Sequence, residues 1–480
     1  MNDDHPTLEI HPAWWKPWNW PWSVWGLVVV VMLALVPFVV RAVFLSTVPA
    51  MAEPFDVAAF VGDEIPPAEN AFTDYRQAHQ MRQRLLQGLQ QRSAVEPKTH
   101  DEFRKGGWAV VDESMRSWLE EHRAALAVWR RGTEKQRALD DSPIHMTFAS
   151  PLVVIQQLRH FGLLAWVDQM RCLHEGDVDE AWQLARAVYR SGGHASWRGP
   201  MTQELIGSTL HSLGSETMQR WAEHPAVTAD QLSTALAQVQ ADFALYESES
   251  NMLKAEYLVL RNSLATRDWA RVTGPVLGGP LDDKLMPASV ARGFLWMVGE
   301  PELTVRISRQ IVANQIREVD KPLPERRQLV GSRFAMLFDT DPTVKRVPEE
   351  LDAYQIDRGV RTSILAKMLL PATKQVDNSF LRFRGRQAAL EVLLAAQAYR
   401  RDQGEFPESL EQLVPQYLEA VPLDPCDPNG GRLLYRRDSP TNAVVWSVGE
   451  DGGNHEGDVV ASYPNRAADA GFLLNAAEPK

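Results

Sequence analysis

Four carboxylates lie within nine residues near the C-terminus, in the stretch SVGEDGGNHEGDVV. They belong to Glu450, Asp451, Glu456 and Asp458, and four glycines are interleaved with them. Negative charges held this close repel one another, so a folded loop must either hydrate them or hold a cation between them. Calcium binds six to eight oxygens from carboxylates and carbonyls, and glycine lets backbone oxygens turn inward. The stretch therefore predicts either a calcium site or a hydrated surface loop.

The elements before this loop must position it. A helix that carries apolar residues from Ala388 to Ala398 ends in a turn at Gly404, and a short helix, PESLEQLVPQYL, follows. After the turn VPLDPCDPNGG, the segments RLLYRR and AVVWSV have strand composition, and Asp438 to Asn442 form the turn between them. The second strand leads into the acidic loop. The tail after Pro464 is polar, and we expect it to be flexible.

The order of motifs from Gln387 to Asp458 resembles the C-terminal part of the major pseudopilin of type II secretion systems. The matching motifs are Tyr399 to Gly404, Phe406-Pro407, Leu413-Val414-Pro415, Leu423-Asp424-Pro425, Leu433-Leu434-Tyr435 and Ser447-Val448-Gly449-Glu450-Asp451-Gly452. The resemblance implies a small α+β module with a bound calcium ion. Carried over residue by residue, it implies Asp451 and Asp458 as carboxylate ligands, with carbonyls from Val448 and a residue near Val459.

The chain also departs from that family. Pseudopilins begin with a short basic leader, cleaved after a glycine, and the membrane helix leads directly into the globular part. Here no such leader precedes the apolar segment, and a long helical region separates that segment from the matching module. We therefore expect that the chain contains this module but is not a filament subunit. The body begins with Glu69-Asn70-Ala71-Phe72 and Tyr75-Arg76-Gln77-Ala78 after a single span, is helical, and ends in this module. This plan resembles single-pass membrane proteins of planctomycete bacteria, which implies an architecture but no activity.

The N-terminal region predicts a membrane helix from Ser23 to Leu45. No charge occurs from Ser23 to Val40, and at ~1.5 Å per residue this stretch nearly crosses a ~30 Å hydrocarbon layer. Six tryptophans that favour the lipid headgroups stand around its start: Trp14, Trp15, Trp18, Trp20, Trp22 and Trp25. The alternative is a signal peptide cleaved at Ala50-Met51-Ala52. The long apolar run and an acidic leader favour an uncleaved anchor in the inner membrane, and we expect the bulk of the chain outside the cytoplasm.

Helical patterns dominate between these ends. One amphipathic helix is predicted from Val111 to Gly132 and another from Leu152 to His174, with a turn at Gly176-Asp177 into a second arm that ends at Gly192. Thr228 and Gln231 form a predicted capping box. The fold class is therefore mainly α. Its predicted parts are a Trp-rich head (1–22), a membrane helix (23–45), a linker (46–68), an irregular α-helical domain (69–379), an α+β module (380–462) and a flexible tail (463–480).

Composition and motifs narrow the function. A net charge of -12 argues against a nucleic-acid partner, and Gly-x-Ser-x-Gly, His-Glu-x-x-His, Walker and dinucleotide motifs do not occur. Cys426 lies between two aspartates, which suits no thiolate nucleophile, and His174 to Asp179 fit helix caps better than a metal site. Tryptophans of the helical region fit a core.

We therefore expect no catalysis, but a membrane-anchored scaffold or interaction protein with an envelope protein as partner and membrane lipid around Ser23 to Leu45. Two alternatives remain open at this point. One is an envelope hydrolase whose site is assembled in the helical domain from residues distant in sequence. The other is a component of a secretion system.

Overall fold

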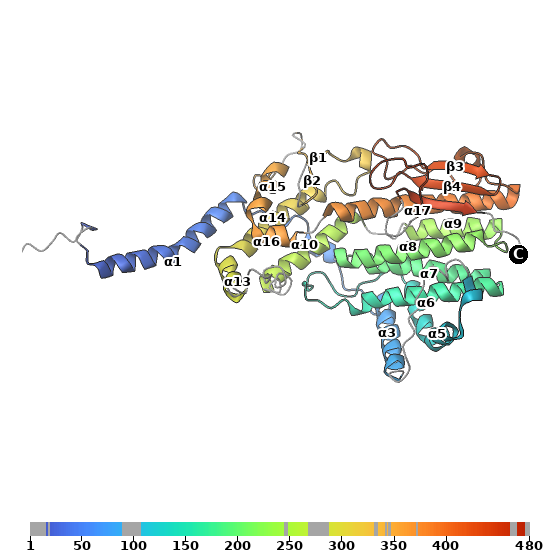
Figure 1. Ribbon diagram of the computed structural model, residues 1–480, viewed down its shortest axis with the longest axis horizontal. Helices are drawn as coiled ribbons and strands as arrows, with labels where there is room; N and C mark the ends of the chain where they lie inside the picture. Colours follow the sequence, from blue (N-terminus) through green and yellow to red (C-terminus); the bar gives the residue numbers. More distant parts are fainter. Residues whose placement is uncertain are drawn as a thin grey trace, which may run out of the picture.

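The structure is a computed structural model, and it describes residues 16–17, 20–88, 107–243, 248–266, 288–330, 335–340, 343, 347–370, 373–460 and 468–475. The chain is mainly helical, as predicted, with one apolar helix, α1 (Trp22–Thr47), and a small three-stranded sheet near the C-terminus. In Figure 1, α1 projects from one end of an elongated body, and the sheet lies toward the other end. Trp14, Trp15 and Trp18 of the predicted head lie outside the described residues.

The body is built mainly from helices, and those from α6 to α9 follow one another with short connections. They are α2 (Val57–Val61), α3 (Ala71–Gly88), α5 (Glu113–Thr133), α6 (Val153–Glu175), α7 (Val178–Ser196), α8 (Met201–Glu223), α9 (Ala229–Phe243), α10 (Glu249–Thr266), α13 (Ala288–Met297), α14 (Glu300–Gln315), α15 (Ala353–Thr362), α16 (Ile364–Leu369) and α17 (Thr373–Gln403). Short 3-10 helices cover Gly107–Val110, Leu323–Glu325 and Leu410–Leu413. The two-residue strands β1 (Leu329–Val330) and β2 (Leu337–Phe338) pair with each other.

Capping residues begin the helices where the sequence predicts them. The carboxylate of Asp112 accepts a hydrogen bond from the third residue of α5, and Asp177 does the same for α7. Gly176 at φ +84° closes α6 and produces the predicted helical hairpin. Thr228 and Gln231 exchange the two bonds of the capping box before α9.

The predicted helix stop at Gly192 is wrong, because α7 continues to Ser196, whereas α5 ends at Thr133, one residue after the predicted stop at Gly132. A Cβ at Gly192 would lie 2.6 Å from the ring of His211 on α8, and a Cβ at Gly132 would lie 2.8 Å from the ring of Tyr75 on α3. Both glycines let a neighbouring helix approach closely.

One hydrophobic core joins the helical body to the C-terminal module. Trp129, Trp166 and Trp221 lie in it, fully buried, as expected for core tryptophans. The same cluster contains Leu390 of α17 and Phe472 near the C-terminus. The predicted boundary between residues 379 and 380 falls inside α17, which contacts α8 and α9 as well as the sheet. The module therefore shares its core with the helices.

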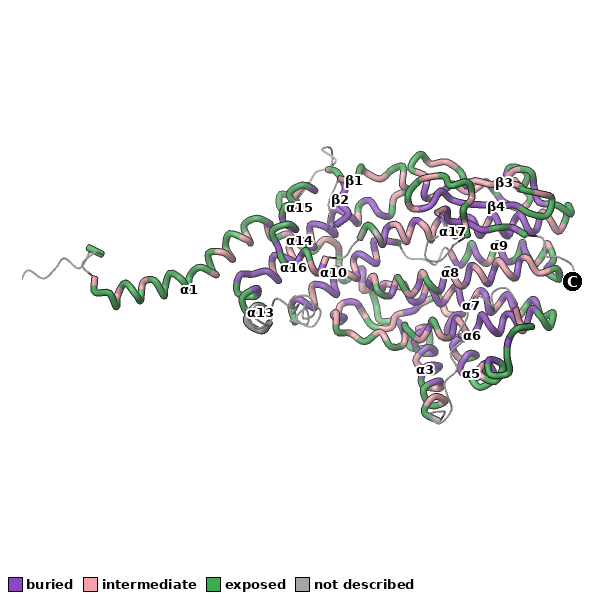
Figure 2. The backbone as a smooth tube through the Cα atoms, viewed as in Figure 1, coloured by how far each residue is buried: buried purple, intermediate pink, exposed green. Residues whose placement is uncertain are grey.

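The sheet is antiparallel in the order β3 (Leu434–Ser439), β4 (Asn442–Ser447), β5 (Ala470–Asn475). The two predicted strands correspond to β3 and β4. The prediction of a flexible tail over 463–480 is wrong for β5, because Phe472 and Leu474 are buried beside β4. Figure 2 shows the buried backbone of this layer against α17, whereas α1 is exposed along most of its length.

The predicted linker packs onto the body. Val48 is 1% exposed and lies in a cluster with residues of α14 and α15. Glu53 forms ion pairs with Arg261 of α10 at 3.1 Å and with Arg309 of α14 at 3.0 Å. Phe60 of α2 is buried against α10. These contacts fix the segment between α1 and the body.

Candidate functional sites: the acidic loop and a carboxyl-lined pocket

The acidic loop begins at the end of β4, the central strand of the sheet. A buried carboxylate, Asp424, fixes this start from the turn before β3. It accepts hydrogen bonds from the hydroxyl of Ser447 (2.6 Å) and from the backbone N–H groups of Val448 (2.9 Å) and Cys426 (2.8 Å). These bonds satisfy one hydroxyl and two backbone N–H groups that burial removes from water.

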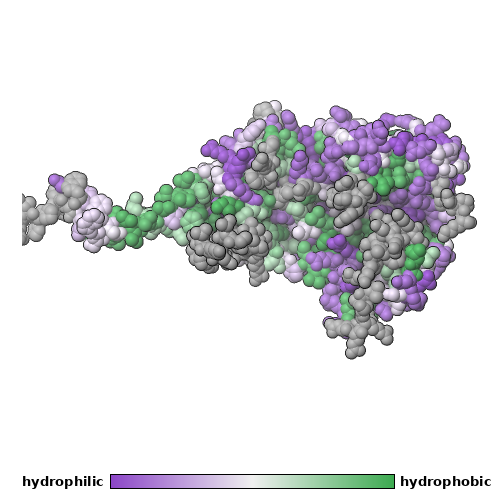
Figure 3. Space-filling model, in the orientation of Figure 1, coloured by the Kyte–Doolittle hydropathy of each residue, from purple (hydrophilic) through white to green (hydrophobic). Residues whose placement is uncertain are grey.

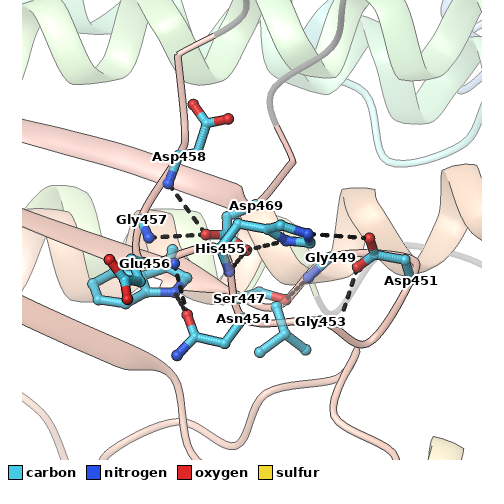
Figure 4. A network of polar contacts seen from close by, with 12 residues as sticks. Ser447, Gly449, Asp451, Gly453, Asn454, His455, Glu456, Gly457, Asp458 and Asp469 are labelled. Atoms are coloured by element: carbon cyan, nitrogen blue, oxygen red, sulfur yellow. Dashed lines mark hydrogen bonds and ion pairs between the residues drawn. The ribbon is translucent and has the colours of Figure 1, made fainter.

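A second buried carboxylate, Asp469, organises the middle of the loop. It is fully buried just before β5 and accepts backbone N–H bonds from Gly457 (2.8 Å), His455 (3.2 Å) and Asp458 (3.2 Å) (Figure 4). Its own backbone N–H donates to the carbonyl of Asp458 at 3.0 Å. The loop therefore wraps its N–H groups around a carboxylate of the chain itself.

The other acidic side chains have separate partners. Glu450 forms an ion pair with Arg382 of α17 at 3.0 Å. Asp451 accepts a bond from the N–H of Gly453 at 2.9 Å, and it lies 3.7 Å from the ring nitrogen Nε2 of His455. Glu456 and Asp458 are exposed to water. Each of these four carboxylates is therefore either exposed to water or paired with a donor of the protein itself.

The implied calcium ligands Asp451, Asp458, Val448 and Val459 all lie in the described part of the chain, from the end of β4 through the acidic loop. In Figure 4 the carboxylate of Asp458 points away from Asp469, and Asp451 lies beyond the ring of His455. Within the ranges described above, no three or more His, Cys, Asp and Glu side chains form a metal-ligand group. The two carboxylates do not converge in this conformation, and the calcium site stays a prediction.

Sequence reasoning missed the two carboxylates that hold the loop. Asp424 stands in the turn Leu423-Asp424-Pro425 that marks the resemblance, but that motif assigns it no partner. Asp469 stands directly before the apolar run AGFLL. The available signal was an acidic residue at the start of an apolar run. The prediction of a flexible tail did not take it into account.

Neither cysteine has the properties of a nucleophile. Burial raises the pKa of Cys426 to about 12, with the charge of Asp424 adding to the effect. Burial also raises the pKa of Cys172 to about 12. Both side chains are free cysteines in the interior, so neither forms a thiolate near neutral pH.

A pocket of about 70 Å³ opens in the helical body between α7, α8, α10 and α17. A water molecule needs about 10–15 Å³ of such a cavity, so a few waters or one small polar group fit into it. The polar lining comes from Ser196, Glu204, Asn251, Arg384 and Gln387. Aromatic rings of Trp197, Phe380 and Phe383 form the apolar part of the wall.

Glu204 is the titratable group of this pocket with the clearest perturbation. Burial raises the pKa of its carboxyl from 4.5 to about 7, and the nearby hydroxyl of Ser196 offsets part of this rise. Among the residues that the structure describes, no Lys or Arg pairs with Glu204. The carboxyl can therefore take up or release a proton near neutral pH.

An ion cluster lies beside the pocket and includes its Arg384. Glu249 is buried, and both burial and the neighbouring charge of Asp377 raise its pKa well above the usual value. Arg326 lies 3.5 Å from Glu249 and 2.7 Å from Asp377, and Arg384 lies 3.7 Å from Glu249. This cluster ties α10 to α17 at one wall of the pocket.

Comparison with known proteins assigns no family. No protein-family model matches the sequence, and neither the curated proteins nor the solved structures contain a significant match.

Proposed function

We propose that the protein is an uncleaved single-pass membrane protein that holds its helical body against one face of the bilayer as a non-catalytic scaffold. One apolar helix of the described residues, α1, is long and apolar enough to cross a membrane. A signal sequence near an N-terminus has the same character. The proposal therefore rests on how α1 joins the body.

The last turn of α1 is part of the folded body, and this observation carries the proposal. Arg306 of α14 donates to the carbonyls of Leu45 (2.9 Å) and Val48 (3.2 Å), and Arg309 donates to that of Met51 (3.0 Å). Cleavage after Ala52 would remove all three acceptors and the buried Val48 side chain. Each of these part-buried bonds contributes about 0.5–1.5 kcal/mol, and Val48 adds buried apolar surface, which favours an intact chain.

The exposed part of α1 has the chemistry of a lipid-facing helix. Its side chains are not buried against the body, and its uncharged stretch has no polar face. Such a surface is stable in a bilayer and costly in water. Inner-membrane location with the body outside the cytoplasm is our proposal for its orientation, from the acidic residues that follow α1.

The C-terminal module supplies the proposed partner surface. A helix followed by an antiparallel sheet and an ordered acidic loop supports, at the level of element order, the resemblance to the pseudopilin globular domain. Calcium at Asp451 and Asp458 stays a proposal from that resemblance and would require both carboxylates to turn toward one another. Attachment to secretion machinery is likewise a proposal.

The test compares the full chain with an A50L/A52L variant that blocks small-residue cleavage. Both alanines are exposed, so the substitutions leave the fold intact. We expect both proteins to keep residues 1–47 by mass spectrometry and to stay in carbonate-washed membranes. A wild-type protein that starts near residue 53 beside an intact variant would identify a signal sequence and refute the anchor.

The scaffold role is tested by crosslinking in intact cells. We expect one envelope protein to be captured repeatedly through the C-terminal module, and less of it when the exposed Glu456 is changed to Lys. Capture that does not depend on the module would contradict this role.

A hydrolase with its site in the pocket is the second candidate, and the perturbed Glu204 favours it. A carboxyl that titrates near pH 7 beside a hydroxyl, in a pocket that an arginine also lines, has the properties of a general acid or base. The purified chain is assayed on generic ester and peptide substrates beside Glu204→Gln and, as a control, Leu205→Ala on the exposed side of α8. Turnover lost only in Glu204→Gln would establish this function, and its absence in all three would remove it.

A further inference from the structure

The base of α1 is locked to α13 and α14 at Arg41. The guanidinium of Arg41 forms an ion pair with Glu302 at 2.5 Å, and its Nη1 lies 3.5 Å from the carbonyl of Trp296. Glu302 is also paired with Arg306 at 2.7 Å. Gly299, at φ +82°, allows this approach, since a Cβ there would lie 3.0 Å from Arg41 Cγ. The end of α13 therefore lies at the level of Arg41.

Arg41 marks the edge of the hydrocarbon layer. The uncharged helix from Trp22 to Val40 measures about 28 Å at ~1.5 Å per residue, close to the ~30 Å of a bilayer core. Arg41 is the first charge after Lys16, and the residues beyond it pack onto the body through Phe44 and Leu45. No free spacer separates the span from the body, so the adjoining helices lie at the headgroups.

The helix α13 presents apolar side chains outward at this level. Phe294, Trp296 and Met297 are 50%, 52% and 39% exposed, whereas Leu295 faces the core beside α10 and α16. A helix of a soluble surface would place polar residues on its outer face. Aromatic rings at the headgroup boundary are instead favourable, and Trp22 stands exposed at the opposite end of the span.

We propose that the exposed face of α13, formed by Phe294, Trp296 and Met297, lies in the lipid interface as a second membrane contact of this protein. Figure 1 shows α13 beside the end of α1, and Figure 3 shows the apolar surface of α1 reaching the body there. The inference rests on the proposed anchor, because α1 sets the bilayer plane. Together α1 and α13 fix both the height and the tilt of the body, which a single helix does not.

The test uses the full chain in lipid nanodiscs with an environment-sensitive dye on one introduced cysteine. Cys172 and Cys426 are buried, so labelling is directed to the new thiol and the wild type gives the background. The labelled positions are Phe294→Cys and Met297→Cys on α13, Leu33→Cys in α1, and Leu473→Cys on β5 as the remote control. Quenching by lipids that carry a nitroxide near the headgroup, or deep in the chains, reports the depth of each dye.

We expect headgroup-level nitroxides to quench the dyes at 294 and 297, deep nitroxides to quench the dye at 33, and neither to affect the dye at 473. Quenching at 33 without quenching at 294 and 297 would overturn the α13 contact and leave the anchor standing. A blue-shifted but unquenched dye at 294 would mean that protein, such as a second copy, covers this face, and would also overturn it. No quenching at 33 would refute the anchor, and the α13 contact with it.

Discussion

Replacing Asp469 by Asn should open the acidic loop. The carboxylate receives three backbone N–H bonds, from His455, Gly457 and Asp458. Asparagine keeps one acceptor oxygen and turns an NH₂ group toward the remaining donor. A hydrogen bond to a charged group contributes ~1.5–3 kcal/mol and a neutral one ~1 kcal/mol. Losing one bond and weakening the other two therefore lowers the free energy of loop opening by about 2–4 kcal/mol.

Hydrogen exchange of the loop amides measures this change directly. A loss of 2–4 kcal/mol corresponds to about 30- to 700-fold faster exchange at residues 455–458 when the loop recloses faster than its open amides exchange. The amides of α6 and α7 should keep their rates, since they lie in the helical body away from the loop. Peptide-resolved mass spectrometry on the full chain in nanodiscs, in calcium-free buffer, gives both values.

The matched control is Asp458→Asn. The side chain of Asp458 is exposed, and only its backbone takes part in the contacts with Asp469. An exposed substitution of this kind changes stability by about 0.5 kcal/mol or less. If Asp458→Asn opens the loop as much as Asp469→Asn does, or if Asp469→Asn changes nothing, the assignment of Asp469 as the centre of the loop is refuted. Repeating both with added Ca²⁺ tests the proposed ion: only bound calcium would make loop protection depend on Asp458.

Two further predictions concern the helical body. Gly214→Ala should lower the free energy of unfolding by about 1–3 kcal/mol, because its Cβ would lie 2.8 Å from the backbone of Tyr189 and push α8 away from α7. In thermal denaturation Gly293→Ala, a control inside α13 with nothing within 4 Å, should be as stable as the wild type or up to ~1 kcal/mol more stable. The pKa of Glu204 is about 7 in the folded protein and 4.5 when the carboxyl is free in water. Its protonated carboxyl therefore contributes its full stabilisation below pH 4.5, and this contribution is lost as the pH rises through 7. Urea denaturation from pH 5 to pH 8 should therefore show Glu204→Gln gaining stability relative to the wild type, and parallel pH profiles would contradict the raised pKa.

Local sequence chemistry predicted the helix starts well. The caps at Asp112 and Asp177 and the box at Thr228 form bonds to residues three positions away. These helix starts therefore depend on local sequence and not on distant parts of the chain. Among the glycines, Gly176 ends α6 as predicted, but Gly192 does not end α7, because it lies where α8 approaches. A glycine has the same signature in a sequence whether it ends a helix or admits another one.

By itself the sequence determined that this protein is mainly helical, that it carries one uncharged helix of membrane length, and that two strands lead into an acidic loop, since these follow from periodicity, composition and capping over short distances. Only the tertiary structure decided the partners of those charges. Asp469 and Asp424 reach the loop from other turns, Glu204 becomes perturbed only where four helices enclose it, and α13 meets Arg41 across more than two hundred residues of chain. Burial and charge pairing depend on which segments fold against one another, and the local sequence pattern does not contain that information.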